Sequence, residues 1–291
     1  MTMKKIVILL LTVLLLAGCQ SAPNVDTTGP GFQIDFFSVG NADAALVMCE
    51  GHYMMIDCGS DEVKESDNSV AYKLDLAFQE KGVTHFDYII CTHPDEDHYE
   101  GFLNLLKGNG QTRTYGKFYC STEVDDNTTT KFREFASSVQ TTFKRITVPS
   151  VGTKFKLGSA FVEVLAVNSD GRGVTNDSSI VLMITYGDTK FLFTGDAESA
   201  TESYLVNNKD IKCDVLKVAH HGSSTSTSEE FLYKAKPDYA VISVGYENRY
   251  GHPSDKVLTR LENRNIQIFR TDSGTVVCNS DGTTVDIHTR R

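Results

Sequence analysis

Four potential metal ligands stand close together in the chain, directly after a segment rich in β-forming residues. Residues 85–90 lead into the run CTHPDEDHYEGF at 91–102. The run contains His93, Asp95, Asp97 and His98. Imidazole and carboxylate groups are the usual ligands of hydrolytic divalent metals. A turn at the end of a buried strand can direct all four inward, because such loops are held by a rigid scaffold. The run therefore predicts a metal site built on strand ends.

The N-terminus has the pattern of a targeting segment rather than of a folded domain. Lys4 and Lys5 precede an apolar stretch at 6–16, which is shorter than the roughly 20 residues of a transmembrane helix. The stretch ends in Leu-Ala-Gly-Cys19, which resembles the lipobox of bacterial lipoproteins. We expect a signal peptide at 1–18, a flexible tether at 19–30 and a single domain at 31–291. Lipid on Cys19 would hold the exported protein on the outer face of a bacterial membrane, whereas an ordinary signal or an uncleaved anchor is the alternative.

The charge balance limits the ways in which the chain can bind nucleic acid. The 38 acidic residues outnumber the 28 Lys and Arg residues, which gives a formal net charge of −10. Removal of residues 1–18 takes away two lysines and no acidic residue, so the charge becomes −12. Generic affinity for phosphate polymers depends on Lys and Arg that release counterions. Any nucleic-acid binding is therefore expected to be local to the site.

Six cysteines besides Cys19 bear on the redox state of the domain. They are Cys49, Cys58, Cys91, Cys120, Cys213 and Cys278. An even number in an exported protein permits disulfides. There is no CxxC spacing, and most of the six lie in apolar, strand-like runs where cysteine serves as a small buried residue. We predict free thiols in the core.

The hydrophobic periodicity predicts β-rich stretches that alternate with helices. Strands are expected at 32–39, 44–49, 53–57, 86–91, 115–120, 161–167, 179–186, 190–194, 215–219, 239–244, 266–270, 275–278 and 285–288. Helices are expected at 70–81, 99–107, 128–139, 198–207, 228–235 and 254–262. This order predicts an α/β fold with two mixed β-sheets and outer helices.

Four more segments place polar residues at predicted strand ends. They contain Asp57, Gly195-Asp196, His220-His221-Gly222-Ser223 and His252. Taken singly, each is a weak signal, because an aspartate after glycine is often a helix cap and paired histidines are often structural. All four segments follow predicted strands, as the run at 91–102 does. This shared position favours a functional site at 91–102 over a merely solvated turn.

Taken in order, these motifs resemble the metallo-β-lactamase fold, a four-layer αβ/βα sandwich. More narrowly, the chain resembles the extracytoplasmic metallo-hydrolase domain of ComEC-type competence (DNA-uptake) proteins. The segments that carry the resemblance are SVGNADA at 38–44, THPDEDH at 92–98, NDSSIV at 176–181, TGD at 194–196, HHGS at 220–223 and GHP at 251–253. They span nearly the whole of the expected domain.

The resemblance implies a centre for one or two divalent ions. The first position would have His93, Asp95 and Asp196, and the second Asp97, His98, Asp196 and His252. The usual motif of the superfamily has histidine where this chain has Asp95, and this hard oxygen ligand favours Mn²⁺ or Mg²⁺ relative to Zn²⁺. His220 and His221 could complete a metal shell or hold a substrate phosphate, and the sequence leaves both roles open.

The resemblance also implies roles for the residues around the metal. Asp97 would orient the attacking water, Asp57 would orient the ligand turn, and His221, Ser223 and Asn176 would hold a substrate phosphate. The expected function is a metal-dependent phosphodiesterase, most simply a nuclease acting on extracellular DNA or RNA. A hydrolase of a small ester, lactone or β-lactam is the alternative. A non-catalytic binding lipoprotein is disfavoured, because every ligand position of the pattern is filled.

Overall fold

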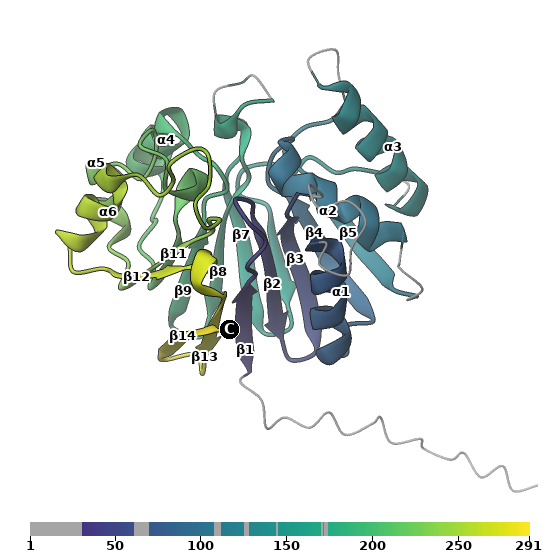
Figure 1. The fold of residues 1–291 in the computed structure, drawn as a ribbon, viewed down its shortest axis with the longest axis horizontal. Helices are drawn as coiled ribbons and strands as arrows, with labels where there is room; N and C mark the ends of the chain where they lie inside the picture. Colours follow the sequence, from purple (N-terminus) through teal and green to yellow (C-terminus); the bar gives the residue numbers. More distant parts are fainter. Residues whose placement is uncertain are drawn as a thin grey trace, which may run out of the picture.

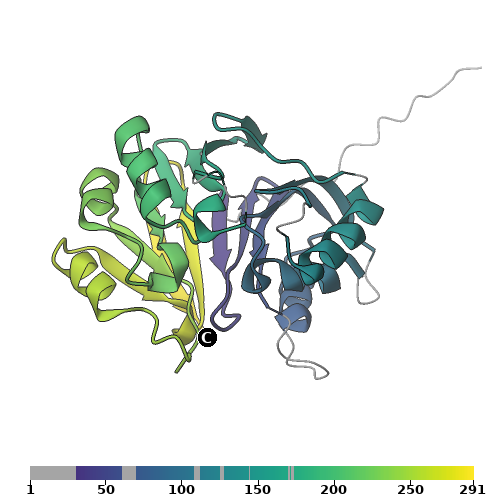
Figure 2. The same ribbon diagram turned by 90° about the horizontal axis from the view of Figure 1, so that it is seen from above.

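Two seven-stranded β-sheets pack face to face, and helices cover the outer face of each sheet (Figures 1 and 2). The computed structural model describes residues 31–60, 70–107, 112–124, 128–143, 145–169, 171 and 174–291. The predicted signal peptide, tether and lipidation site at Cys19 lie outside these ranges. In the described part of the chain, no helix is long and apolar enough to cross a membrane.

The first sheet combines the N-terminal strands with a hairpin from the far end of the chain. Its order is β14 (Val285–Arg290), β13 (Thr275–Ser280), β1 (Phe32–Phe36), β2 (Ala44–Cys49), β3 (His52–Cys58), β4 (His85–Cys91) and β5 (Thr114–Cys120). β3, β4 and β5 are parallel, and the other neighbours are antiparallel. The helices packed on its outer face are α1 (Val70–Glu80), α2 (Glu96–Lys107) and α3 (Thr130–Phe143).

The second sheet is built from the middle and C-terminal parts of the chain. Its order is β12 (Gln267–Arg270), β11 (Tyr239–Ile242), β10 (Val215–Lys217), β9 (Thr189–Phe193), β8 (Val181–Tyr186), β7 (Ala160–Ala166) and β6 (Lys154–Leu157). β9 to β12 are parallel, and β6 to β9 are antiparallel. α4 (Ser199–Asn208), α5 (Glu229–Ala235) and α6 (Asp255–Glu262) lie on its outer face. The described residues also form 3₁₀ turns at η1 (Asn176–Ser178), η2 (Ala219–Gly222) and η3 (Thr271–Ser273).

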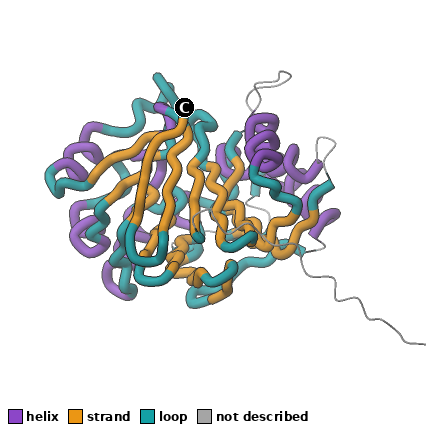
Figure 3. The backbone as a smooth tube through the Cα atoms, turned by 90° about the horizontal axis from the view of Figure 1, so that it is seen from below, coloured by secondary structure: helices purple, strands orange, loops and turns teal. Residues whose placement is uncertain are grey.

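Alternating side chains in the strands supply the layers with their cores. In β2, Ala45 and Val47 face the opposite sheet, whereas Ala44 and Leu46 face the helices. This alternation is the two-residue period of a strand that is buried on both faces. Aromatic rings join the sheets; the ring centroids of Phe36 and Phe193, for example, are 5.4 Å apart. Figure 3 shows the strands in the interior with helices on either side.

The predicted fold class is confirmed, and the differences from prediction are local. β6 was not predicted, because its sequence KFKL is short and half charged. α2 begins at Glu96 rather than at residue 99, so two of the predicted ligands belong to its first turn. All six cysteines of the domain are free and buried, as predicted.

The strand directions bring the predicted site residues to one edge. Carboxyl ends of parallel strands lie at the same edge of a sheet, where binding residues gather in α/β folds. β3 and β4 end there in the first sheet, and β9, β10 and β11 end there in the second. The loops at this edge carry the polar segments singled out in the sequence.

Candidate metal centre

His98 lies at the middle of the polar cluster. It stands in the first turn of α2 and is fully buried. Its Nδ1 is 2.8 Å from Oδ2 of Asp57, at the end of β3. The same carboxylate accepts hydrogen bonds from the amide and the hydroxyl of Thr92, each at 2.7 Å. With Nδ1 held by Asp57, the opposite nitrogen, Nε2, is directed away from it and is left for another ligand.

One group of potential ligands comprises His93, His98 and Asp196. Their ligand atoms lie within 4.8 Å of one another, and all three residues are buried. Among the described residues, Nε2 of both histidines and Oδ1 of Asp196 have no hydrogen-bond partner. Buried polar atoms are rarely left unpaired, because desolvation is then uncompensated. Two imidazole nitrogens and one carboxylate oxygen that converge in this way fit a divalent cation.

A second group, Asp97, His98 and His221, adjoins the first. His221 Nδ1 is 2.9 Å from the carbonyl oxygen of Ser243 and must donate to it, so in the neutral ring Nε2 carries the lone pair. That Nε2 is 3.1 Å from Asp97 Oδ2. Asp196 lies between the groups, with Oδ1 3.4 Å from His98 Nε2 and Oδ2 3.6 Å from His221 Nε2. Its two oxygens thus face one group each, as in a carboxylate that bridges two ions.

The charges of the cluster support one another. Burial alone would lower the pKa of His98, but Asp196, Asp57 and Asp97 raise it well above its usual value. The pKa of His221 is also raised, against the effect of burial, by Asp196 and Asp97. Burial would raise the pKa of Asp97, yet His98 and His221 lower it to about 2. The metal-free centre therefore favours protonated His98 and His221, and a cation would replace these protons.

Backbone geometry at the strand ends brings these side chains together. Gly195, after β9, has a φ of +52°, and a Cβ atom there would lie 2.8 Å from Ser179 Oγ. This close approach lets Ser179 Oγ accept the amide hydrogen bond of Asp196 at 3.0 Å. In η2, His220 and His221 also have left-handed φ values, of 49° and 52°. A left-handed backbone conformation is uncommon for residues other than glycine. It persists where the surrounding structure holds the residue in that conformation, as at functional sites.

The other predicted residues lie at the margin of the two groups. Asp95 Oδ2 is 3.5 Å from His93 Nε2, but its side chain is 49% exposed, and it belongs to no group. His220 Nε2 is 3.8 Å from Asp196 Oδ2, and its Nδ1 is 3.1 Å from Oε1 of Glu198. His252 belongs to no group either; its ring centroid is 5.6 Å from that of His220.

The two polar residues predicted to hold phosphate have partners within the protein. Asn176 Nδ2 lies 3.3 Å from His220 Nδ1. The hydroxyl of Ser223 lies 2.9 Å from that of Thr225. Both residues stand on the turns that position the histidines, and their contact with a substrate stays a prediction.

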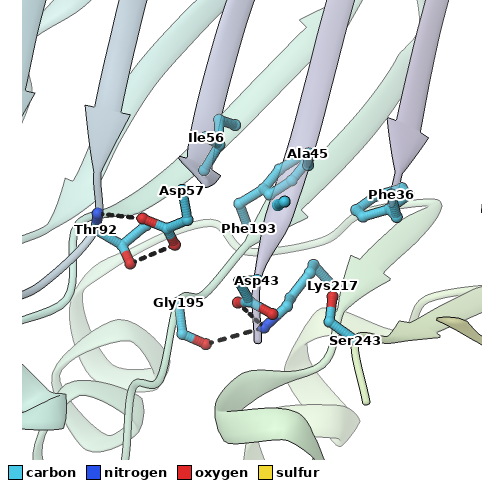
Figure 4. Close-up of a pocket in the computed structure, with 11 residues that line it drawn as sticks. Phe36, Asp43, Ala45, Ile56, Asp57, Thr92, Phe193, Gly195, Lys217 and Ser243 are labelled. Atoms are coloured by element: carbon cyan, nitrogen blue, oxygen red, sulfur yellow. Dashed lines mark hydrogen bonds and ion pairs between the residues drawn. The ribbon is translucent and has the colours of Figure 1, made fainter. Parts of the chain in front are cut away.

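An ion pair behind the centre was not predicted. Lys217, the last residue of β10, is buried and pairs with the carboxylate of Asp43 (Figure 4). Its Nζ also lies 3.5 Å from the carbonyl oxygen of Gly195. Asp43 Oδ1 is 3.6 Å from His221 Nδ1, and both residues of the pair line a cavity of about 10 Å³. The signal in the sequence was a lysine inside the apolar run at 215–219.

The fold and the paired His/Asp groups define a class of protein. Residues 38–246 match the model of the metallo-beta-lactamase superfamily, and the chain belongs to this family. The similarity to a solved member, the metallo-beta-lactamase fold protein YhfI of Bacillus subtilis, extends over 82% of this chain and 95% of that protein, with a TM-score of 0.53 and 13% identity. This likeness concerns the fold.

Within the family, the chain is similar to competence proteins and to recombination protein 2 of Haemophilus influenzae, with 28% identity over 80% of this chain and 26% of that relative. It is 32% identical over 258 residues to ComE operon protein 3 of Bacillus subtilis. The aligned region covers 84% of this chain and 32% of that relative. It is 27% identical over 269 residues to competence protein ComA of Neisseria gonorrhoeae. The aligned region covers 89% of this chain and 34% of that relative. The chain thus spans about a third of the length of these curated relatives.

Proposed function

We propose that this protein is a metal-dependent phosphodiesterase that cleaves DNA or RNA. The observation that carries the proposal is the carboxylate of Asp196, whose two oxygens face two adjoining ligand groups. Two cations held a few ångströms apart suit the in-line displacement at a phosphodiester, because they can stabilise both the attacking and the leaving oxygen. The similarity to competence and recombination proteins supports nucleic acid as the substrate.

The residues present would divide the binding of the ions. His93, His98 and Asp196 would hold one, and Asp97, His221 and Asp196 would hold a second, with His98 between them. A divalent cation bound here would supply hydroxide near neutral pH, because it would lower the pKa of a bound water far below that of bulk water. We retain Mn²⁺, Zn²⁺ and Mg²⁺ as candidate ions.

The protein itself supplies orientation and charge. Asp57 fixes the ring of His98, and the Ser243 carbonyl oxygen fixes that of His221. Asp97 stays ionised across the neutral range, so it can accept a hydrogen bond from an attacking water. His252 has a pKa lowered by burial and by the nearby His220 and His221, and its buried Nδ1 has no partner among the described residues. A neutral imidazole is the form that binds a metal, and we keep His252 as a proposed ligand.

The test is cleavage by purified protein that has been stripped of metal. Single- and double-stranded DNA and RNA are incubated with Mn²⁺, Mg²⁺ or Zn²⁺, and Asp196→Asn is assayed beside the wild type. We expect cleavage that requires metal and that is lost in the variant. Metal uptake without cleavage of any nucleic acid would contradict the proposal. A panel of lactones, esters and β-lactams would then identify the alternative class of hydrolase.

We further propose that the protein is exported and held at the outer face of the membrane by lipid on Cys19. The proposal rests on the charged start, the apolar stretch at 6–16 and the Leu-Ala-Gly-Cys ending. Labelling of expressing cells with radioactive palmitate should mark the wild type and not Cys19→Ser. Equal labelling of both proteins, or of neither, would refute the assignment.

A further inference from the structure

A groove opens from the metal centre between two loops that are distant in the sequence. One loop, at 38–43, leads into β2, and the other, at 243–254, joins β11 to α6. They are in direct contact, because a Cβ atom on Gly245 would lie 2.7 Å from the amide nitrogen of Asn41. The groove between them has a volume of about 500 Å³, and Asp97 is among its lining residues. A volume of this size is in the range of small-ligand sites.

Two exposed aromatic rings lie together in this groove. Its lining includes Tyr246, which is 77% exposed, and Tyr250, which is 56% exposed. Large apolar side chains gain by burial, so two exposed tyrosines in one groove beside a catalytic centre point to a ligand with flat apolar faces.

Contacts with Arg249 and His252 position the ring of Tyr250 beside the metal centre. The guanidinium of Arg249 lies 4.9 Å from the centroid of the ring, and its Nη2 donates to the Tyr250 hydroxyl at 2.6 Å. The ring of Tyr250 also stacks with that of His252, with the ring centroids 5.9 Å apart and an interplanar angle of 23°. His252 in turn stacks with His221 at 6.5 Å and 20°. A file of nearly parallel rings thus leads from the groove to a ligand of the proposed metal.

The charge of the groove decides how a polyanion could be held. Among its described lining residues, Arg249 is the one cationic side chain, whereas Glu96 and Asp97 are acidic. The whole chain carries a net charge of −10. Counterion release therefore supplies little affinity for a phosphate backbone, and most of the affinity must come from contacts with the bases.

We propose that this groove binds unpaired nucleotides of a single-stranded nucleic acid, whose bases stack on Tyr246 and Tyr250 while Arg249 contacts a phosphate. In a duplex the bases stack on one another, so their faces are available only in single strands. A buried side-chain oxygen of Asn41, which has no partner among the described residues, can accept a hydrogen bond from an N–H group of a base. This inference rests on the proposed function, because it assigns the substrate of the same site.

The experiment compares a thymidine octamer with an abasic octamer that has the same sugar–phosphate backbone. KM values for metal-dependent cleavage are measured for the wild type, Tyr246→Ala, Tyr250→Ala and the corresponding phenylalanine variants. One stacked base corresponds to at least about a five-fold effect on binding. We expect each alanine variant to raise KM for the thymidine octamer by about that factor or more, and to change KM for the abasic octamer much less. Phenylalanine should restore the wild-type KM.

Tyr233 on α5 provides a matched control. It is 70% exposed, and Lys236 Nζ lies 5.3 Å from its ring centroid, but it does not line the groove. Tyr233→Ala should leave every KM unchanged. The salt dependence of octamer binding should be shallow, with a slope of log K against log salt near −0.7, as for a single neutralised phosphate.

Two outcomes separate the failure of this inference from the failure of the proposed function. Cleavage with an unchanged KM in both alanine variants would overturn the groove and leave the phosphodiesterase intact. If the wild type cleaves nothing, binding of a labelled thymidine octamer is measured by fluorescence anisotropy in EDTA instead. Binding that weakens in the double tyrosine variant, and not in Tyr233→Ala, would still support the groove. Binding that is absent, or equal in all variants, would overturn it.

Discussion

The buried ion pair between Lys217 and Asp43 gives a sharp prediction about stability. Lys217→Met keeps the length and apolar stem of the side chain and removes its charge. It leaves the Asp43 carboxylate in the interior, where its remaining neighbours are His221 Nδ1 at 3.6 Å and His98 Nδ1 at 3.9 Å. The environment is acidic, because Asp57 lines the same cavity.

The magnitude follows from the burial of both partners. Lys217 is 3% exposed and Asp43 is 5% exposed. Removal of one partner from a buried pair costs about 3–5 kcal/mol, since a charge is left without compensation. The two nearby histidines offset part of this cost, so we expect about 3 kcal/mol in the free energy of unfolding. At about 2–4 °C per kcal/mol, the melting temperature should fall by about 6–12 °C.

Urea unfolding of the metal-free protein measures this cost, with Asp43→Asn and the double variant completing a double-mutant cycle. The double variant should be more stable than Lys217→Met, because it removes both charges together. Lys190→Met on the neighbouring β9 is the control. Lys190 is 39% exposed and pairs with Asp210 at 3.6 Å, so its loss should cost less than about 1 kcal/mol. A cost below about 1 kcal/mol for Lys217→Met, or strictly additive effects in the cycle, would refute the reasoning.

Three further predictions concern the metal centre. Mn²⁺ or Zn²⁺ at a hundred times its Kd should stabilise the wild type by about 2.7 kcal/mol in thermal unfolding. His98→Ala should lose this gain, because both ligand groups include His98. A retained gain would contradict the assignment. Because the folded-state pKa of His98 and of His221 is raised, their contribution to metal-free stability is full below about pH 6.5 and declines at higher pH, while metal affinity measured by titration calorimetry should rise over the same range. The opposite trend in either would refute the charge argument. Gly195→Ala should cost about 1–2 kcal/mol for its left-handed backbone and weaken metal binding, because Asp196 follows it, whereas Gly51→Ala, which has open space around it, should cost stability alone.

Much of the fold could be predicted, because its strands have a regular alternation. β2 occupies the predicted residues 44–49, since each of its faces meets a different core. The start of α2 was misplaced because Glu96 and Asp97 were taken for part of a turn. They are acidic residues of the first helical turn, where the helix dipole favours negative charge.

The site could be predicted as a set of residues but not as a geometry. His220 and His221 are adjacent, and sequence gave no means to tell which one faces the ligand groups. The left-handed backbone at both positions sends His221 toward Asp97 and His220 toward Glu198. The role of Lys217 was not predicted for a related reason, because a lysine in a strand is usually solvated. Only the tertiary structure shows that this lysine is buried beside Asp43.

The position of β1 in the first sheet imposes an order on folding. β1 pairs with β2, which follows it closely, and with β13, near the other end of the chain. Pairing across so long an interval is slow, because the entropy of closing the intervening loop opposes it. Until β13 has paired with β1, one edge of β1 has unpaired backbone groups. Such an edge can pair with non-native strands and aggregate. We therefore expect the nascent chain to depend on chaperones that shield this edge.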